Sequence, residues 1–506
     1  MLIDYSNHNN DENIESQICI IGAGAAGITL ALELSKKKFD IVLVESGDFK
    51  SNDTVQNLYA GYNTGKEYPI ESSRLRYFGG TTNHWGGMCR PLDEHDFIKK
   101  DYVNYSGWPF SYNELKPFYS LAHNYLELGK YDYSIDHGRE LKKSFRQCLL
   151  EKSVIIEKKL FKRSTPVRYL KKYKKNITKN KYIRCYNNIN IINLHLSNDK
   201  QHCNEAHGVS IDGFKLNFKS KFFIICMGGI ETPRLLLNSS KQEKKGFGNI
   251  NGLVGKFFQE HPHLYSGELL LNPKLDPSKF FDCGGDWMNV KKKKPTSIWP
   301  IYTLTSEIQL KEKILNGSIS LRGNLSNKSI IKSNNPLLKD YMEKMTSNIF
   351  GHRKNSKLLR IPIFSRTESS PNPNSKITLS NKKDILGQYK INLNWELNEL
   401  DFKSIYKTLE YFNAEANRLN IGRVQINYED TKEKFEFWGG QHHMGTTRMH
   451  TSAKQGVVNE NLRMHNVDNV YISGSSVFPT SGFANPTLTI VALSIRLASY
   501  LSKKIV

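Results

Sequence analysis

The sequence predicts an α/β protein in which a doubly wound, Rossmann-like domain is interrupted by a second, α+β domain built on an antiparallel sheet. Three observations support this prediction. An apolar strand, a Gly-rich turn, a helix and another apolar strand follow one another before residue 46. Period-2 patterns typical of antiparallel strands occupy much of 263–439. Apolar strands and Gly-rich turns return around 222–226 and after 440.

The first domain begins after a polar lead-in, residues 1–16. Apolar residues from Ile18 to Ile21 run into a Gly-rich turn, and Ile28 opens a helix with an apolar face. Residues 40–45 then form the next buried strand, which completes a βαβ unit.

The sequence pattern predicts that the chain returns to this domain twice. A helical period covers 110–130, short alternating strands follow at 190–218, and a buried strand at 222–226 leads into a helix. We therefore assign the first domain to three segments. The second domain, 263–439, also takes part of a basic insertion, 131–189. The three segments of the first domain are 17–130, 190–262 and 440–506.

The composition is basic: 72 Lys and Arg stand against 49 Asp and Glu, a formal net charge of +23. Two interpretations exist: a surface for an anionic partner, or lysines spread over every exposed face. We favour the second, since the lysines are dispersed apart from 142–184 and Lys291–Lys294. Because neither zinc-finger spacing nor an aromatic RNA-binding strand accompanies them, no nucleic acid is expected.

The sequence carries no apolar run of about 18 residues, so no transmembrane helix is expected. The polar first residues do not resemble a secretory signal. Seven cysteines are scattered without a CxxC pair, which fits a reducing compartment, and a cytoplasmic location is predicted. These cysteines are Cys19, Cys89, Cys148, Cys185, Cys203, Cys226 and Cys283.

The turn Gly22-x-Gly24-x-x-Gly27 is typical of dinucleotide binding. The first glycine permits the tight turn, the second lets the backbone approach a pyrophosphate, and the third lets the helix pack on the strand. Glu45 ends the next strand, where a carboxylate accepts hydrogen bonds from a ribose. This motif alone does not choose between NAD and FAD.

Other segments of the sequence distinguish between these two cofactors. The sequence resembles the glucose–methanol–choline (GMC) family of FAD-dependent oxidoreductases, and within it the bacterial sugar and polyol dehydrogenases and pyranose oxidases. The resemblance covers 17–130, 218–262 and 436–502. The segments that carry it are Gly22–Glu45, Phe78–Pro91, Met227–Leu237, Gly255–Pro262, Gln441–Met449 and Ser473–Thr489.

The resemblance implies FAD as cofactor. It also implies that the loop around residue 80 passes the flavin, where His84 is similar to a histidine that forms a covalent flavin link in some members. Both covalent and non-covalent FAD stay open. Besides Gly22, Gly24, Gly27 and Glu45, the residues expected to contact FAD are Gly79, Gly80, Thr81, Asn83, His84, Gly228, Gly474, Ser475, Pro486 and Thr487.

The resemblance also implies the catalytic pair, His442 and Asn485. Oxidation of an alcohol needs a base for the hydroxyl proton, and an imidazole with a pKa of about 6.5 suits neutral pH. Asn485 would position the substrate oxygen, since an amide is no base, and would also cap the following helix. His443 would face away as a wall residue. His261 and His263 are expected to be structural, without a metal.

The predicted function is therefore FAD-dependent oxidation of a CH–OH group in a sugar, glycoside or polyol. An apolar alcohol, such as a sterol or aryl alcohol, is the alternative substrate. A polyanion-binding protein that uses 142–184 is a third hypothesis. The electron acceptor is left open: it is oxygen, a quinone or a separate protein. The basic segment 142–184 is a candidate docking face for such a protein.

Overall fold

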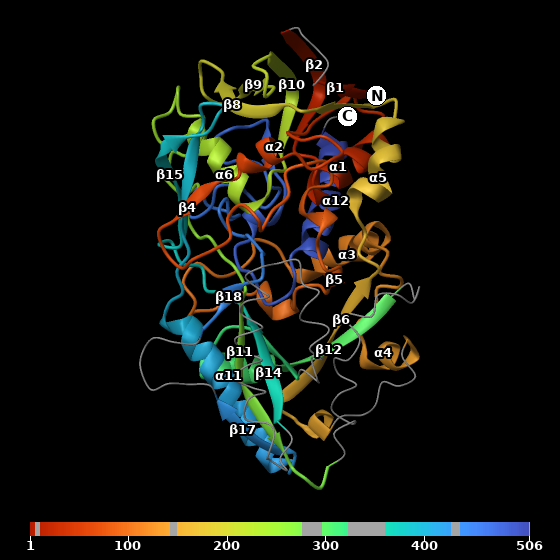
Figure 1. Ribbon diagram of the computed structural model, residues 1–506, viewed down its shortest axis with the longest axis vertical. Helices are drawn as coiled ribbons and strands as arrows, with labels where there is room; N and C mark the ends of the chain where they lie inside the picture. The colour runs from red at the N-terminus through yellow and green to blue at the C-terminus, as the bar shows by residue number, and fades with distance from the viewer. Residues whose placement is uncertain (6–10, 142–148, 276–295, 322–359, 427–435, 505–506) are drawn as a thin grey trace.

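A computed structural model describes residues 1–5, 11–141, 149–275, 296–321, 360–426 and 436–504. In Figure 1 the first domain occupies the upper part of the molecule and the antiparallel sheet of the second domain the lower part, along the long axis. The two chain ends lie near each other at the top of this view.

The first domain is built on a mixed sheet. Its central parallel strands are apolar, and Ile41–Val44 is buried along its whole length, as expected where helices cover both faces. The described strands lie in the order β1 (Leu2–Asp4), β7 (Ile183–Asn187), β3 (Ile41–Val44), β2 (Glu12–Ile21), β10 (Lys215–Ile225), β9 (Cys203–Val209) and β8 (Asn190–Leu196), with β19 (Val470–Ile472) also on β10.

Helices from distant parts of the chain pack around this sheet (Figure 1). The C-terminal helix contacts both the first helix and α3, which explains why the last segment returns to this domain. The helices are α1 (Ala25–Ser35), α2 (Asp53–Asn57), α3 (Tyr112–Leu126), α5 (Tyr169–Thr178), α6 (Gly228–Asn238) and α12 (Thr487–Lys504). Single 3₁₀ turns lie at Gly80–Asn83, Glu94–Asp96, Leu149–Lys152 and Ser475–Val477.

The second domain is an antiparallel sheet backed by a long helix. The described strands lie in the order β17 (Gly422–Ile426), β11 (Pro262–Leu271), β14 (Arg360–Thr367), β13 (Gly317–Leu321), β12 (Thr296–Leu304), β6 (Ile156–Ser164) and β5 (Met88–Cys89), with β18 (Trp438–Gly439) also on β11. The helices here are α4 (Ile135–Leu141), α8 (Ser306–Glu312) and α11 (Glu399–Arg418).

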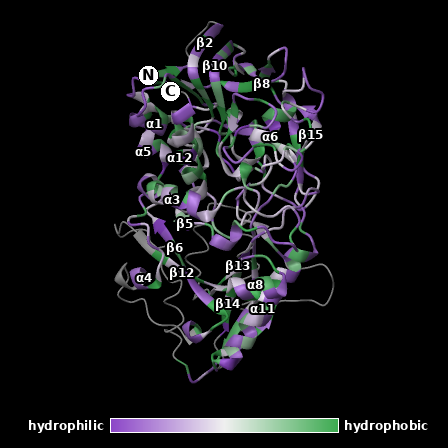
Figure 2. Cartoon of the chain, turned by 180° about the vertical axis from the view of Figure 1, so that it is seen from behind, coloured by the Kyte–Doolittle hydropathy of each residue, from purple (hydrophilic) through white to green (hydrophobic). Residues whose placement is uncertain are grey.

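Helix α11 shows why these residues form these elements. Asn398 and Asp401 make a reciprocal capping box at its start. Ile405, Leu409 and Phe412 recur at helical spacing and are buried in the core of the second domain. Figure 2 accordingly shows hydrophobic and hydrophilic residues alternating along α11. The predicted fold class, with its antiparallel second sheet, is confirmed.

The structure divides three predicted segments more finely. From the segment 17–130, β5 pairs with β6 in the second sheet. The basic insertion 131–189 supplies β6 to the second sheet, but α5 and β7 belong to the first domain. A three-stranded sheet beside α6 has the order β15 (Lys376–Lys383), β16 (Tyr389–Asn394) and β4 (Gly61–Asn63). Its apolar residues share a core with Ile230 of α6, so this part of 263–439 packs on the first domain.

Candidate active site

The Gly-rich turn between β2 and α1 has a geometry that depends on its glycines. Gly22 has a φ of +105°, in the left-handed region that favours glycine. Gly24 caps α1, and nothing lies within 4 Å of the position that a Cβ there would take. The start of α1 is therefore open, and the N–H groups of its first turn favour a bound anion.

Glu45 follows β3 directly and joins this turn to the neighbouring strand. Its carboxylate accepts hydrogen bonds from the backbone N–H of Ala23, at 2.8 Å, and of Gly47, at 3.1 Å. The side chain is buried, but it lies on the wall of a cavity. A carboxylate held in this way has the position expected of a ribose ligand.

The cavity has a volume of about 680 Å³ and is walled by segments from the whole length of the chain. Backbone at Gly228 and Gly474 also faces open space, since nothing lies within 4 Å of a Cβ built there. The glycine-lined space fits a dinucleotide that approaches the backbone closely. The predicted residues on its wall are Gly22, Gly24, Glu45, Gly80, Thr81, His84, Gly228, His442, Gly474, Ser475, Asn485, Pro486 and Thr487.

Three residues predicted to contact the cofactor are not on this wall. A Cβ at Gly27 would lie 1.9 Å from the carbonyl oxygen of Gly22, so Gly27 serves the packing of α1 on the turn. Gly79 has a φ of +92° and donates its N–H to the carbonyl of Ala23 at 2.8 Å. Asn83 donates to the carbonyl of Phe78 at 2.9 Å. All three shape the loops behind the cavity.

His442 and Asn485 meet on the cavity wall. His442 Nε2 lies 3.1 Å from Asn485 Nδ2, although 43 residues separate them in the chain. The pKa of His442 is held well below 6.5, first by desolvation and then by His261, His263, Arg366 and His443. A neutral imidazole in this position can accept a proton from a hydroxyl group.

Glu260 holds the segment that carries this histidine. Its carboxylate accepts the backbone N–H of His442, at 2.8 Å to Oε2, and the hydroxyl of Tyr68, at 2.5 Å. Burial raises the pKa of Glu260 to about 7, although these hydrogen bonds oppose the rise. The hydroxyl of Tyr68 also lies 2.8 Å from Nε2 of His443. The ring of His443 is therefore held by Tyr68, whereas the ring of His442 contacts Asn485.

His261 and Arg366 contact the candidate pair directly. His261 Nδ1 lies 2.9 Å from His442 Nδ1, and Arg366 donates to Asn485 Oδ1 at 2.8 Å. The prediction that His261 is only structural missed this contact, although its place in the segment Gly255–Pro262 was a signal. Arg366 lies on β14, in a segment outside the resemblance, so the sequence carried no signal for it.

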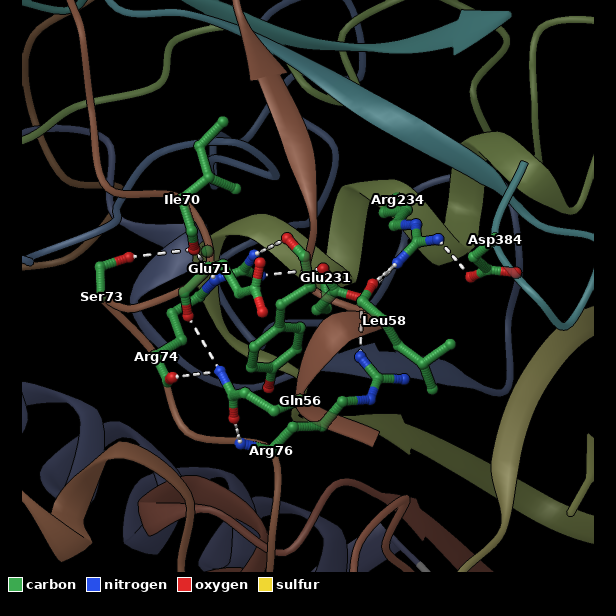
Figure 3. Close-up of polar contacts among 12 residues, drawn as sticks. Gln56, Leu58, Ile70, Glu71, Ser73, Arg74, Arg76, Glu231, Arg234 and Asp384 are labelled. Carbon is green, nitrogen blue, oxygen red and sulfur yellow. Dashed lines mark hydrogen bonds and ion pairs between the residues drawn. The ribbon is translucent and has the colours of Figure 1, made fainter. Parts of the chain in front are cut away.

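A buried arginine cluster lies beside the cavity (Figure 3). Glu231 of α6 pairs with Arg74 at 2.8 Å and with Arg76 at 3.0 Å. Arg234, one turn along α6, contacts Glu231 at 3.3 Å and also Asp384, which directly follows β15, at 2.6 Å. Burial alone would raise the pKa of Glu231, but the three arginines outweigh it and lower the pKa to about 2.

The C-terminal part of the chain, residues 371–494, matches the family model described as GMC oxidoreductase. It contains both His442 and Asn485. This C-terminal part of the chain is similar to the GMC oxidoreductases. Two curated relatives agree: 2-methyl-1,2-propanediol dehydrogenase of Mycolicibacterium austroafricanum is 26% identical over 58% of this chain and 50% of its own length. The fructose dehydrogenase large subunit of Gluconobacter japonicus is 24% identical over 55% and 46%.

Solved structures match almost the whole length of this chain. A formate oxidase variant from Aspergillus oryzae RIB40 has a TM-score of 0.57 at 14% identity, covering 98% of this chain and 99% of the other. Pyridoxine 4-oxidase from Mesorbium loti has a TM-score of 0.57 at 13% identity, covering 96% and 99%. At these identities the likeness establishes the shared fold.

The chain matches about half the length of the curated relatives named above. None of the helices in the described ranges combines the length and the hydropathy that a membrane crossing requires.

Within the described ranges, no three His, Cys, Asp or Glu side chains are grouped so that they could hold a metal ion.

Proposed function

We propose that this chain oxidises a CH–OH group of a sugar, glycoside or polyol to a carbonyl, with FAD as cofactor. The observation that carries the proposal is the meeting of His442 and Asn485, at 3.1 Å, in the cavity that also contains the Gly22–Gly24 turn and Glu45. A base and a dinucleotide cradle in one cavity are what such a reaction requires.

The cavity wall supports FAD. The turn at Gly22–Gly24 and the start of α1 would hold the pyrophosphate, and Glu45 would hold the ribose. Bound FAD supplies the acceptor for the hydride that leaves the carbon atom. FAD modification is known in a structural neighbour, formate oxidase of Aspergillus oryzae RIB40. A covalent link through His84, which lies on the cavity wall, stays a prediction.

The protein's own residues would handle the proton. His442 is neutral because its surroundings lower its pKa, so it can take the hydroxyl proton as the hydride leaves. Asn485 would donate an amide hydrogen to the substrate oxygen and so hold it beside His442. His443, bound to Tyr68, would remain a wall residue.

The substrate class is supported by the names of the two relatives, one a propanediol dehydrogenase and the other a fructose dehydrogenase. An apolar alcohol remains the alternative substrate. A polyanion-binding function has less support, because lysines of the basic segment have partners inside the protein. Lys159 pairs with Asp93 at 2.8 Å, and Lys158 and Lys172 pair with Glu151 and Glu127. Residues 142–148 lie outside the described ranges.

The test is anaerobic reduction of the bound flavin by a panel of sugars, polyols, and aryl and sterol alcohols. We expect a sugar or polyol to bleach the flavin absorbance. Reduction by apolar alcohols alone would establish the alternative, and a flavin that none of the panel reduces would overturn the proposal. Aerobic and quinone-supplied repeats would identify the acceptor. A separate acceptor protein and a cytoplasmic location stay predictions.

The base is tested with His442→Ala. This variant should bind FAD but reduce it roughly 10²- to 10⁴-fold more slowly, the usual contribution of a general base. His195→Ala is a matched control, because His195 is a histidine on β8 outside the cavity wall. Near-normal reduction by His442→Ala would move the base to another residue, with His443 the first candidate.

A further inference from the structure

Four polar side chains from four separate segments form one hydrogen-bonded chain that runs through the candidate base. Arg366 of β14 donates Nη1–H to Asn485 Oδ1 at 2.8 Å. Asn485 Nδ2 lies 3.1 Å from His442 Nε2, and His442 Nδ1 lies 2.9 Å from His261 Nδ1. The order is therefore Arg366, Asn485, His442, His261.

The direction of each hydrogen bond follows from the arginine. A guanidinium group only donates, so the Asn485 atom that it contacts must be the amide oxygen. The amide NH₂ is then turned toward His442, and NH₂ also only donates. His442 Nε2 must accept, which means that it carries the lone pair.

The hydrogen bond at Nε2 also determines whether Nδ1, the second ring nitrogen of His442, is protonated. A neutral imidazole carries one proton, so His442 is protonated at Nδ1 and donates to Nδ1 of His261. The lone pair of His442 is thus at Nε2, where it accepts the amide hydrogen of Asn485. A substrate hydroxyl would replace that hydrogen at Nε2 before giving up its proton there. Which nitrogen of a catalytic histidine is protonated is commonly set by the partner of the other nitrogen.

Arg366 is itself held in one orientation. It is 9% exposed, its Nε–H donates to His263 Nε2 at 3.1 Å, and its guanidinium lies 5.1 Å from the ring centre of Phe161. The planar guanidinium reaches His263 and Asn485 at the same time. A lysine ammonium, a point charge on a flexible stem, lacks this fixed fork.

We propose that Arg366 is a positioning residue which, through the amide of Asn485, fixes His442 in the tautomer with its lone pair at Nε2. The importance of this tautomer for catalysis rests on the proposed function, in which His442 is the base. The tautomer itself can be observed without any substrate. The residue comes from the second domain, so the base becomes correctly set only when the two domains are packed together.

The first experiment is ¹⁵N NMR of histidine-labelled holoenzyme, with His442→Ala to assign the signals. In the wild type we expect His442 to be neutral, protonated at Nδ1 and unprotonated at Nε2. Arg366→Met should shift His442 toward the other tautomer or a mixture, and Arg366→Lys should restore the wild-type pattern only in part. Arg360→Met, which removes an arginine of the same strand that pairs with Glu268 instead of Asn485, is the control.

A proton on Nε2 in the wild type would overturn the proposal, whether or not a variant folds. An unchanged tautomer in a folded Arg366→Met would also overturn it. Flavin content and the melting temperature establish folding, and if Arg366→Met does not fold, Arg366→Lys decides by the same criterion. These readouts need no turnover, so a failed substrate panel and a failed tautomer assignment are separate results.

The second experiment is a double-mutant cycle on the rate of flavin reduction. If Arg366 acts through Asn485, Arg366→Met should slow reduction about tenfold in the wild type but change it little in an Asn485→Ala background. Equal slowing in both backgrounds would show that Arg366 acts on the substrate or on His442 directly, and would overturn the positioning role.

Discussion

At the scale of single residues, His442 differs from an ordinary histidine in its pKa. Desolvation lowers this pKa most, and His261, His263, Arg366 and His443 lower it further. The surroundings thus keep the ring neutral in the pH range where a free imidazole begins to take up a proton, at about 6.5. A base must be unprotonated to act.

We predict from this that the rate of flavin reduction falls little when the pH is lowered from about 8 to about 6.5. Protonation of His442 would stop the reaction only well below the ordinary pKa of a histidine. Stopped-flow measurement of the limiting rate against pH checks this. A rate that halves near pH 6.5 would mean that His442 keeps an ordinary pKa.

At the scale of elements, the turn from β2 to α1 separates two kinds of glycine. A Cβ at Gly24 would meet nothing within 4 Å, whereas one at Gly27 would lie 1.9 Å from the carbonyl oxygen of Gly22. Gly24 also has a φ of −85°, which any residue can adopt. Gly24 is therefore free for ligand approach, and Gly27 is required by packing.

The two alanine variants should accordingly fail in different ways. Gly24→Ala should leave the melting temperature of the flavin-free protein nearly unchanged but weaken FAD binding, because the methyl group enters the space above the turn. Gly27→Ala should destabilise the protein itself, since α1 would have to move away from β2. Thermal melting and flavin titration distinguish them. Equal destabilisation by both would contradict the assignment.

At the scale of the whole molecule, the arginine cluster of Figure 3 joins parts that are far apart in sequence. Glu231 on α6 binds Arg74 and Arg76 of the loop after β4, and Arg234 reaches Asp384 beside the three-stranded sheet. Removal of one member leaves buried charge uncompensated, which commonly costs about 3–5 kcal/mol.

Glu231→Gln should therefore lower stability near neutral pH and alter its dependence on pH. The pKa of Glu231 falls from an ordinary 4.5 to about 2 on folding. Its contribution is thus complete above about pH 4.5 and disappears as the pH falls toward 2. Between about pH 5 and pH 3, urea unfolding should show a smaller loss of stability in Glu231→Gln than in the wild type. Equal losses would contradict the role of Glu231.

Much of the fold could be predicted from local pattern. The strand at 18–21, its Gly-rich turn and the strand at 40–45 are specified by residues close together in the sequence, so the βαβ unit could be identified directly. The division of 131–189 could not. β6 and β7 join different sheets, and strand pairing depends on partners more than a hundred residues away.

The candidate site, like the fold, could be predicted only in part from the sequence. His442 and Asn485 lie in motifs whose spacing carries the family resemblance, and glycines mark where a backbone must come close to a ligand. Gly27, Gly79 and Asn83 belong to the same motifs but lie behind the cavity, because a motif does not distinguish packing from contact.

The fold class and the dinucleotide turn could be predicted from the sequence, because each depends on residues close together in the chain. The two residues expected to handle the substrate could be proposed from the family resemblance of their motifs. Which nitrogen of His442 faces Asn485 could be seen only in the folded protein, since Arg366 reaches that amide from a strand of the second domain. The proton positions of a catalytic histidine depend on hydrogen bonds across domains, and no local pattern in a single sequence specifies them.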